Sequence, residues 1–135
     1  RCEDESQMNM DRSQEKDTLT DQVFLTSSRR QLLEQELARY LQILAGRPDL
    51  EQVIVFGSLA TGETHPWSDI DLVIVQHSDL TFWDRLREMR RLLRPRVGTD
   101  LLVYTPAEFK QLLRTRLFFQ QEILDRGKVV YERNG

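Results

Sequence analysis

Two short apolar runs separated by one loop constrain this chain more than any other feature. The runs Val53–Phe56 and Leu72–Val75 are each four residues long and rich in β-branched side chains, which is typical of buried strands. The loop between them opens with Gly57-Ser58 and closes with Ser68-Asp69-Ile70-Asp71. The sequence therefore predicts two neighbouring core strands joined by a segment that carries a glycine turn and a pair of aspartates.

The two aspartates are spaced to lie side by side. In an extended chain residues i and i+2 project from the same face, so Asp69 and Asp71 share one face while Ile70 and Leu72 point into a core. Two carboxylates about 4 Å apart repel by roughly 4 kcal/mol at an effective dielectric near 20, and a proton or a cation relieves this repulsion. Mg²⁺ prefers carboxylate oxygens and leaves positions open for phosphate. An isolated Asp-x-Asp is also typical of a solvated turn, so the pair alone does not identify a metal site.

The Gly57-Ser58 turn favours the metal interpretation. A glycine lets backbone N–H groups approach an anion closely, and the Ser58 hydroxyl can add a further contact. A short helix that opens at Leu59 would contribute a favourable dipole. A phosphate cradle beside a carboxylate pair predicts a site for a nucleoside triphosphate.

Gly57-Ser58, ten intervening residues and then Asp69-Ile70-Asp71 resemble the signature of the DNA polymerase β-like nucleotidyltransferase superfamily. The stretch GSLATGETHPWSDIDLVIV is similar to its minimal nucleotidyltransferase branch, whose members often pair with HEPN-domain proteins in toxin–antitoxin modules. The resemblance extends from about Glu51 to Glu132. It implies an α/β fold, with helices packed against a small, mixed, twisted sheet.

The resemblance also implies a mechanism. Asp100 is the one charge on a predicted strand over Gly98–Tyr104; alone it could be a strand-edge aspartate, but it matches the third carboxylate of the superfamily. Two Mg²⁺ ions are expected, one held by Asp69, Asp71 and Asp100 at the attacking hydroxyl and one held by Asp69 and Asp71 at the triphosphate of ATP or another NTP. Asp100 could also accept the proton of the nucleophile. Gly57 and Ser58 would position the β- and γ-phosphates.

Larger relatives in the superfamily carry a second domain that binds the acceptor, and we expect no room for one after Tyr131. The acceptor is therefore expected to be a partner or to be held by one. The resemblance favours transfer of AMP from ATP to a tyrosine of a HEPN-type toxin, with this chain as the antitoxin. One alternative is an antitoxin that acts by contact alone; the other is one half of a split antibiotic nucleotidyltransferase. Self-association of the chain stays open.

Two positions in the loop bear on these alternatives. Family members often have a basic residue where Thr61 stands, and its absence favours the contact-only alternative, whereas the three carboxylates oppose it. His65 is interpreted as an exposed loop residue, and Trp67 either stacks on a base or covers the loop. Ser68 is predicted to shape the turn into Asp69 through local hydrogen bonds.

The flanking segments predict a single domain. Residues 1–26 are polar and acid-rich, which predicts a flexible segment, and residues 27–135 are expected to form one nucleotidyltransferase domain. Ser27 or Ser28 is predicted as the N-cap of a helix that ends near Ala45, before Gly46. Its predicted buried stripe comprises Leu33, Leu37, Tyr40, Leu41 and Leu44.

The C-terminal half predicts three more helical segments and two more strands. One helix is predicted over 80–94 and another over 118–125. Between them, a helix is predicted to begin after Thr105 as N-cap, with Pro106 and Glu108 in its first turn. A last strand is predicted over 128–131. The first of these helices and its exit carry a basic cluster, interpreted either as a solvated face or as a patch for an acidic partner, tRNA or a nucleotide tail. The cluster comprises Arg85, Arg87, Arg90, Arg91, Arg94 and Arg96.

The net charge, the lengths of the apolar runs and the cysteine content bear on the expected partners and cellular compartment. The net charge of −3 argues against nucleic acid as the main partner. No apolar run approaches the length of a membrane span, so no membrane partner is expected. The single cysteine, Cys2, cannot form an internal disulfide, and a reducing cytoplasm is the expected compartment.

Overall fold

The computed structural model describes residues 25–133, and the rest of the predicted flexible segment lies outside them. Four strands form one sheet in the order β3-β2-β1-β4: β1 is Leu50–Phe56, β2 is Ile70–Gln76, β3 is Thr99–Tyr104 and β4 is Lys128–Glu132. β1 pairs antiparallel with both β2 and β4, while β2 and β3 are parallel. This mixed sheet with packed helices confirms the predicted fold class.

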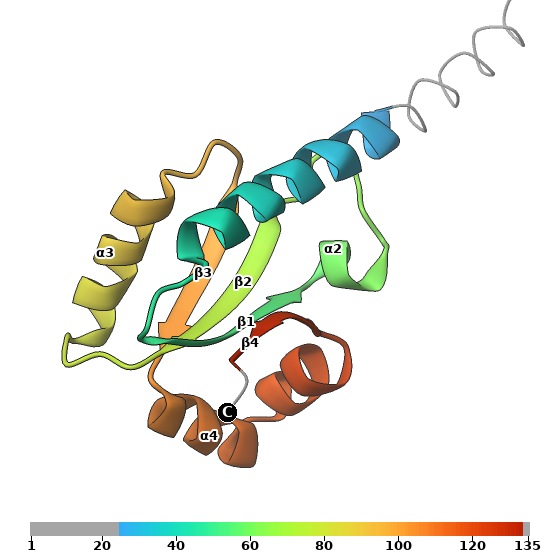
Figure 1. Ribbon diagram of the computed structural model, residues 1–135. Coiled ribbons are helices and arrows are strands. Elements are labelled where there is room, and N and C mark those ends of the chain that lie inside the picture. The colour runs from blue at the N-terminus through green and yellow to red at the C-terminus, as the bar shows by residue number, and fades with distance from the viewer. Residues whose placement is uncertain (1–24, 134–135) are drawn as a thin grey trace, which may run out of the picture.

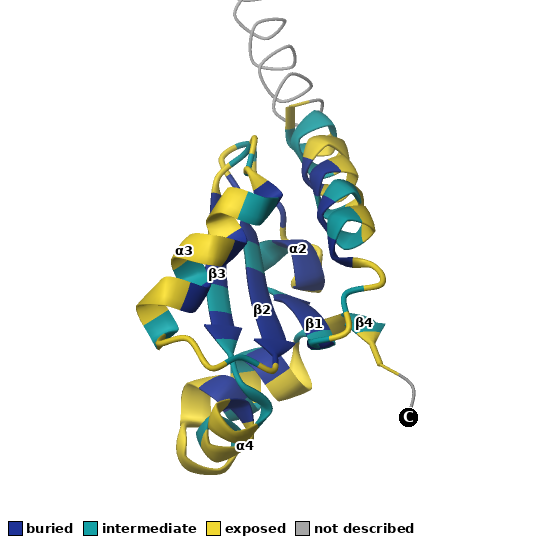
Figure 2. Cartoon of the chain, turned by 60° about the vertical axis from the view of Figure 1, so that its left-hand side comes forward, coloured by how far each residue is buried: buried dark blue, intermediate teal, exposed yellow. Residues whose placement is uncertain are grey.

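Helices cover both faces of the sheet (Figure 1). The N-terminal helix (residues 25–44) and α3 (Phe82–Leu93) lie on one face, and α4 (Pro106–Thr115) and the π-helix η1 (Phe119–Asp125) lie on the other. Leu72 and Ile74 of β2 belong to the first core, and Val73 and Val75 belong to the second. A strand buried on both faces needs a continuous apolar run, and residues 72–75 of β2 form such a run. Figure 2 shows the buried strands between helices whose outer sides are exposed.

The N-terminal helix packs as its apolar stripe predicts. Leu33, Tyr40 and Leu44 are buried, and the Tyr40 hydroxyl shares a hydrogen bond of 2.8 Å with Thr99 Oγ1 at the start of β3. Gly46 follows the helix at a φ of 82°, a conformation that glycine adopts without strain. The prediction of an N-cap at Ser27 or Ser28 is wrong, because residue 25 is already helical. Serine inside a helix is only weakly unfavourable, so the helix continues through both serines.

The two later helices begin with side-chain caps. Thr81 caps α3 by accepting a hydrogen bond from the Asp84 N–H, so α3 begins at Phe82 rather than at residue 80. Thr105 and Glu108 form the predicted capping box of α4, with Pro106 in its first turn. The predicted helix over 118–125 is the π-helix η1. None of the helices between residues 25 and 133 combines the length and hydropathy that a membrane span requires.

Arg85 was assigned to the exposed basic cluster, and that assignment is wrong. Arg85 is 2% exposed, because helical spacing aligns it with the buried Met89 and Leu93. The guanidinium donates to the Leu80 carbonyl at 2.8 Å and to Glu108 Oε1 at 2.5 Å. It also donates to the Val103 carbonyl at 3.4 Å, so one buried cation ties α3, β3 and α4 together.

Because Arg85 is buried, loss of its anionic partner should destabilise the fold. Glu108→Gln can retain the capping box, so it removes the ion pair selectively, and we expect a loss of about 1–2 kcal/mol in the free energy of unfolding. Asp84→Asn, which breaks the exposed pair with Arg87, should cost less than about 0.5 kcal/mol. Urea unfolding at pH 7 measures both, and equal losses in the two variants would contradict a special role for Arg85.

Candidate functional site

The three predicted site aspartates lie at the end of the sheet where β2 and β3 begin and β1 ends. Asp71 and Asp100 are paired residues in the parallel register, and Phe56 of β1 is opposite Asp71. Asp69 precedes β2 by one residue. Strand alternation places Asp71 and Asp100 on the face of Val73 and Leu102, which is the face that α4 and η1 cover.

The electrostatics of this end of the sheet disfavour a full set of negative charges. Asp71 is partly buried, while Asp69 and Asp100 are exposed. Burial, a hydrogen bond with Asp100 and the charges of Asp100 and Asp69 raise the pKa of Asp71 to about 7. Asp71 therefore needs either a proton or a cation at neutral pH.

Two glycines leave the space that these carboxylates occupy. Gly57 has a φ of 73°, and a Cβ on it would collide with the Asp71 carboxylate. A Cβ on Gly98 would collide with the Asp69 carboxylate, and the Gly98 carbonyl accepts a hydrogen bond from the Ile70 N–H at 3.0 Å. Gly98 was not among the predicted site residues: it opened the predicted strand of Asp100, and only the fold brings it against Asp69.

The loop between β1 and β2 presents backbone donors beside the aspartates. Gly57 is the N-cap of the short helix α2 (Ser58–Thr61), which ends at Gly62. The N–H groups of Ala60 and Thr61 donate to the Gly57 carbonyl, each at 3.1 Å, which leaves those of Ser58 and Leu59 to face an anion. Ser58, the other predicted phosphate contact, is partly buried at this turn.

Local hydrogen bonds hold the second half of the loop. Ser68 Oγ accepts from the His65 N–H at 2.7 Å, and the Ser68 N–H donates to the His65 carbonyl at 3.0 Å, as predicted for the turn into Asp69. His65 is exposed, as expected. Its ring stacks on that of Trp67, with 5.1 Å between the centroids, and Trp67 is 74% exposed.

Arg29 of the N-terminal helix reaches the site, and sequence reasoning missed it. Its Nε donates to the Ser68 carbonyl at 2.8 Å, and one terminal nitrogen lies 3.4 Å from Asp69 Oδ1. Arg29 and Asp69 are 40 residues apart in the chain, so no local pattern links them. Arg29 thus fixes both the turn before β2 and the first aspartate.

The donors at this site suit a hard divalent cation, because they are carboxylate oxygens and because Asp71 needs a proton or a cation at neutral pH. Within residues 25–133, however, no three His, Cys, Asp or Glu side chains are gathered closely enough to form a ready metal cluster. The structure brings Asp71 and Asp100 together, whereas Asp69 is paired with Arg29. A three-carboxylate ligand set therefore requires Asp69 to turn from Arg29 toward the pair.

Residues 38–135 match the family described as "Polymerase beta, Nucleotidyltransferase". The chain belongs to this nucleotidyltransferase family. Among solved structures it is similar to a putative nucleotidyltransferase from Sulfolobus solfataricus, with 20% identity, a TM-score of 0.60 and coverage of 81% of this chain and 88% of that one. No curated protein matches the chain.

Two further solved structures resemble the nucleotidyltransferase more distantly. One is a toxin–antitoxin with AMP-PNP, at 22% identity, a TM-score of 0.45 and coverage of 75% of this chain and 74% of that one. The other is a tri-AMPylated Shewanella oneidensis HEPN toxin in complex with an MNT antitoxin, at 20% identity, a TM-score of 0.40 and coverage of 77% and 73%. At these identities the two structures say nothing about the function of this chain.

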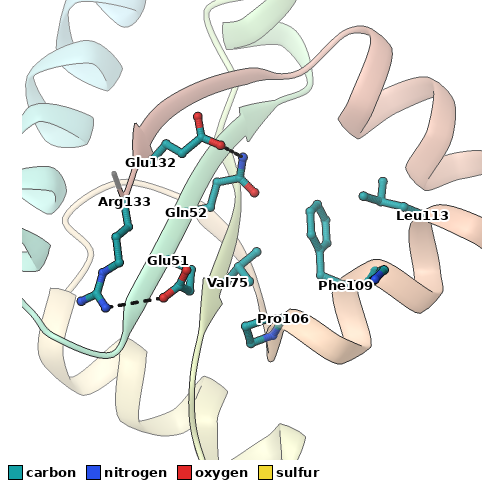
Figure 3. A pocket seen from close by; sticks show the side chains of 9 residues that line it. Glu51, Gln52, Val75, Pro106, Phe109, Leu113, Glu132 and Arg133 are labelled. Carbon is teal, nitrogen blue, oxygen red and sulfur yellow. Dashed lines mark hydrogen bonds and ion pairs between the residues drawn. The ribbon is translucent and has the colours of Figure 1, made fainter. Parts of the chain in front are cut away.

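A cavity of about 310 Å³ lies at the opposite end of the sheet from the aspartates (Figure 3). β1 contributes Glu51 and Gln52 to it, α4 contributes Phe109 and Leu113, and Arg133 follows β4. No site aspartate lines this cavity, so it is separate from the candidate nucleotidyltransferase site.

The raised pKa of Asp71 predicts a pH-dependent stability in the absence of divalent cations. The folded protein retains a proton that the unfolded chain releases above pH about 4, so the free energy of unfolding falls as the pH rises toward about 7. Asp71→Asn removes this term, and at pH 8 the variant should be more stable than wild type by about 2 kcal/mol after allowance for solvent screening. The difference should shrink toward pH 4.

Urea unfolding between pH 5 and 8 in the presence of EDTA measures this difference. Asp79→Asn, an exposed change before α3, is the matched control and should leave the pH dependence as in wild type. A parallel pH profile for wild type and Asp71→Asn would contradict the assignment of the proton to Asp71.

Proposed function

We propose that this chain is a metal-dependent nucleotidyltransferase that transfers AMP from ATP to a hydroxyl. The observation that supports this most is the juxtaposition of Asp71 and Asp100 on paired positions of β2 and β3, next to a glycine turn with free backbone donors. Membership of the nucleotidyltransferase family gives the reaction class. The carboxylates supply ligands for a metal, and the turn supplies donors for phosphate.

The residues divide the task as follows. Asp69, Asp71 and Asp100 would hold Mg²⁺, which would neutralise phosphate charge and lower the pKa of the attacking hydroxyl. Asp100 is exposed and would accept the proton of that hydroxyl. Gly57 and Ser58 would hold the β- and γ-phosphates with a backbone N–H and a hydroxyl.

For the acceptor we propose a tyrosine of a HEPN-type partner, with this chain as the antitoxin. The motif's likeness to the minimal nucleotidyltransferase branch suggests this partner. A surface beside the site supports a macromolecular acceptor: Phe118 is 48% exposed and packs edge-on against Phe56, the neighbour of Asp71, at 6.1 Å. Leu117 and Leu124 nearby in the chain are each 64% exposed, and exposed apolar patches typically mark binding surfaces.

Binding of ATP should require both Mg²⁺ and Asp69. Calorimetry should show binding to wild type with Mg²⁺, and an affinity at least about tenfold weaker with EDTA or in Asp69→Asn, because the phosphate charge is then left without a counter-ion. Asp79→Asn is exposed and lies past the end of β2 that is opposite Asp69, so it should bind as wild type does. Equal binding with and without Mg²⁺ would refute the metal role.

Transfer itself should depend on the same carboxylates. With ATP, Mg²⁺ and a HEPN-type protein as acceptor, wild type should add AMP to a partner tyrosine, and Asp71→Asn should reduce the rate by at least about 100-fold. Intact mass and peptide mapping measure the adduct and its position. An inactive wild type that still neutralises the partner would favour inhibition by contact alone, and labelling of an aminoglycoside instead would favour the split antibiotic enzyme.

A further inference from the structure

The loop that would hold the triphosphate brings no positive charge of its own. Residues 57–71 contain no Lys or Arg, but they contain Glu63, Asp69 and Asp71. A triphosphate adds several further negative charges, and Mg²⁺ offsets only part of them. If the site binds a nucleotide, another segment of the chain has to supply a cation to the phosphates.

The N-terminal helix carries two arginines to this loop. The segment that follows α2 passes the start of this helix (Figure 1), where Arg29 holds the Ser68 carbonyl and Asp69. Arg30 lies next to it in the chain, and one of its terminal nitrogens is 3.9 Å from the position that a Cβ on Gly62 would take. Arg29 therefore binds the end of the loop that carries Asp69, and Arg30 lies beside the end of α2.

The contact at Gly62 is placed for a phosphate that binds at Ser58. Gly62 is the left-handed C-cap of α2, and its N–H donates to the Ser58 carbonyl at 3.0 Å, so it lies one turn from Ser58. Thr61 is three residues after Ser58 and lies on the same side. A guanidinium beside Gly62 thus lies within about one helical turn of Ser58, as a long side chain at residue 61 would.

Arg30 is also free enough to change partners. Its present partner is Glu34 at 3.3 Å, and the two side chains are 43% and 54% exposed. Exposed pairs of this kind contribute little to stability, whereas a guanidinium binds a phosphate through two parallel hydrogen bonds. A bound triphosphate would compete successfully with Glu34.

We propose that Arg30 is a phosphate-binding residue, so that the N-terminal helix supplies the positive charge that the loop lacks. This inference rests on the proposed nucleotide site. It gives the N-terminal helix a part in substrate binding in addition to its part in the core. It also predicts that the arginine can be moved from the helix to residue 61 without loss of binding.

The test is the affinity for ATP with Mg²⁺, measured by calorimetry. Arg30→Gln should weaken binding about tenfold, with a smaller effect on AMP, which lacks the outer phosphates. Arg87→Gln, a change at an exposed arginine of α3, is the matched control and should bind as wild type does. Thr61→Arg added to Arg30→Gln should restore most of the lost affinity, and Arg30→Lys should retain part of it.

The outcomes separate this inference from the proposed function. If wild type does not bind ATP, the proposed nucleotide site fails and this inference fails with it. If wild type binds and Arg30→Gln binds equally well, only this inference is overturned. An equal loss for ATP and AMP, or no recovery with Thr61→Arg, would also overturn it. Thermal melting of Arg30→Gln should match wild type within a few degrees, since the side chain is exposed and contributes little to the fold.

Discussion

The parallel pairing of β2 with β3 is the constraint on which the site depends. Parallel register places Asp71 directly beside Asp100, and the same-sign charges raise the pKa of Asp71 together with its burial. The rest of the fold keeps that pair in place. Each strand is fixed by core residues on both faces, so neither aspartate can withdraw without displacing its apolar neighbours.

Two glycines, which have no side chain, make room for the aspartates at this end of the sheet. Gly57 and Gly98 face the carboxylates of Asp71 and Asp69, and any Cβ at either position would meet a carboxylate. The missing Cβ atoms let both carboxylates sit against the backbone at this close-packed end of the sheet. The turn at Gly57 therefore serves two purposes, since the same glycine exposes backbone N–H groups toward an anion.

Much of this arrangement could be predicted from the sequence, where local rules decide the outcome. The apolar runs, the capping box at Thr105 and the stripe through Tyr40 have fixed periods or spacings, and each lies where predicted. Arg85 was misassigned because a charged residue at a buried helical position looks like a surface residue until its partners are known. Arg29 and Gly98 both contact Asp69, and these contacts depend on tertiary packing. The periodicity of a single sequence does not predict such contacts.

The N-terminal helix links the core to the site. Leu33, Tyr40 and Leu44 anchor it in the core, and Glu36 adds a polar contact by accepting from the Arg96 N–H at 2.6 Å. Because a helix is stiff over one turn, burial of Leu33 fixes where residues 29 and 30 emerge. Those residues precede the segment that matches the family, which begins at residue 38. The family-matched segment thus contains the three aspartates, and the chain before it contains Arg29, which pairs with Asp69, and Arg30 beside it. A nucleotide site divided in this way would couple the affinity for phosphate to the docking of the helix, because any shift of Leu33 in its core position would move both arginines away from the loop.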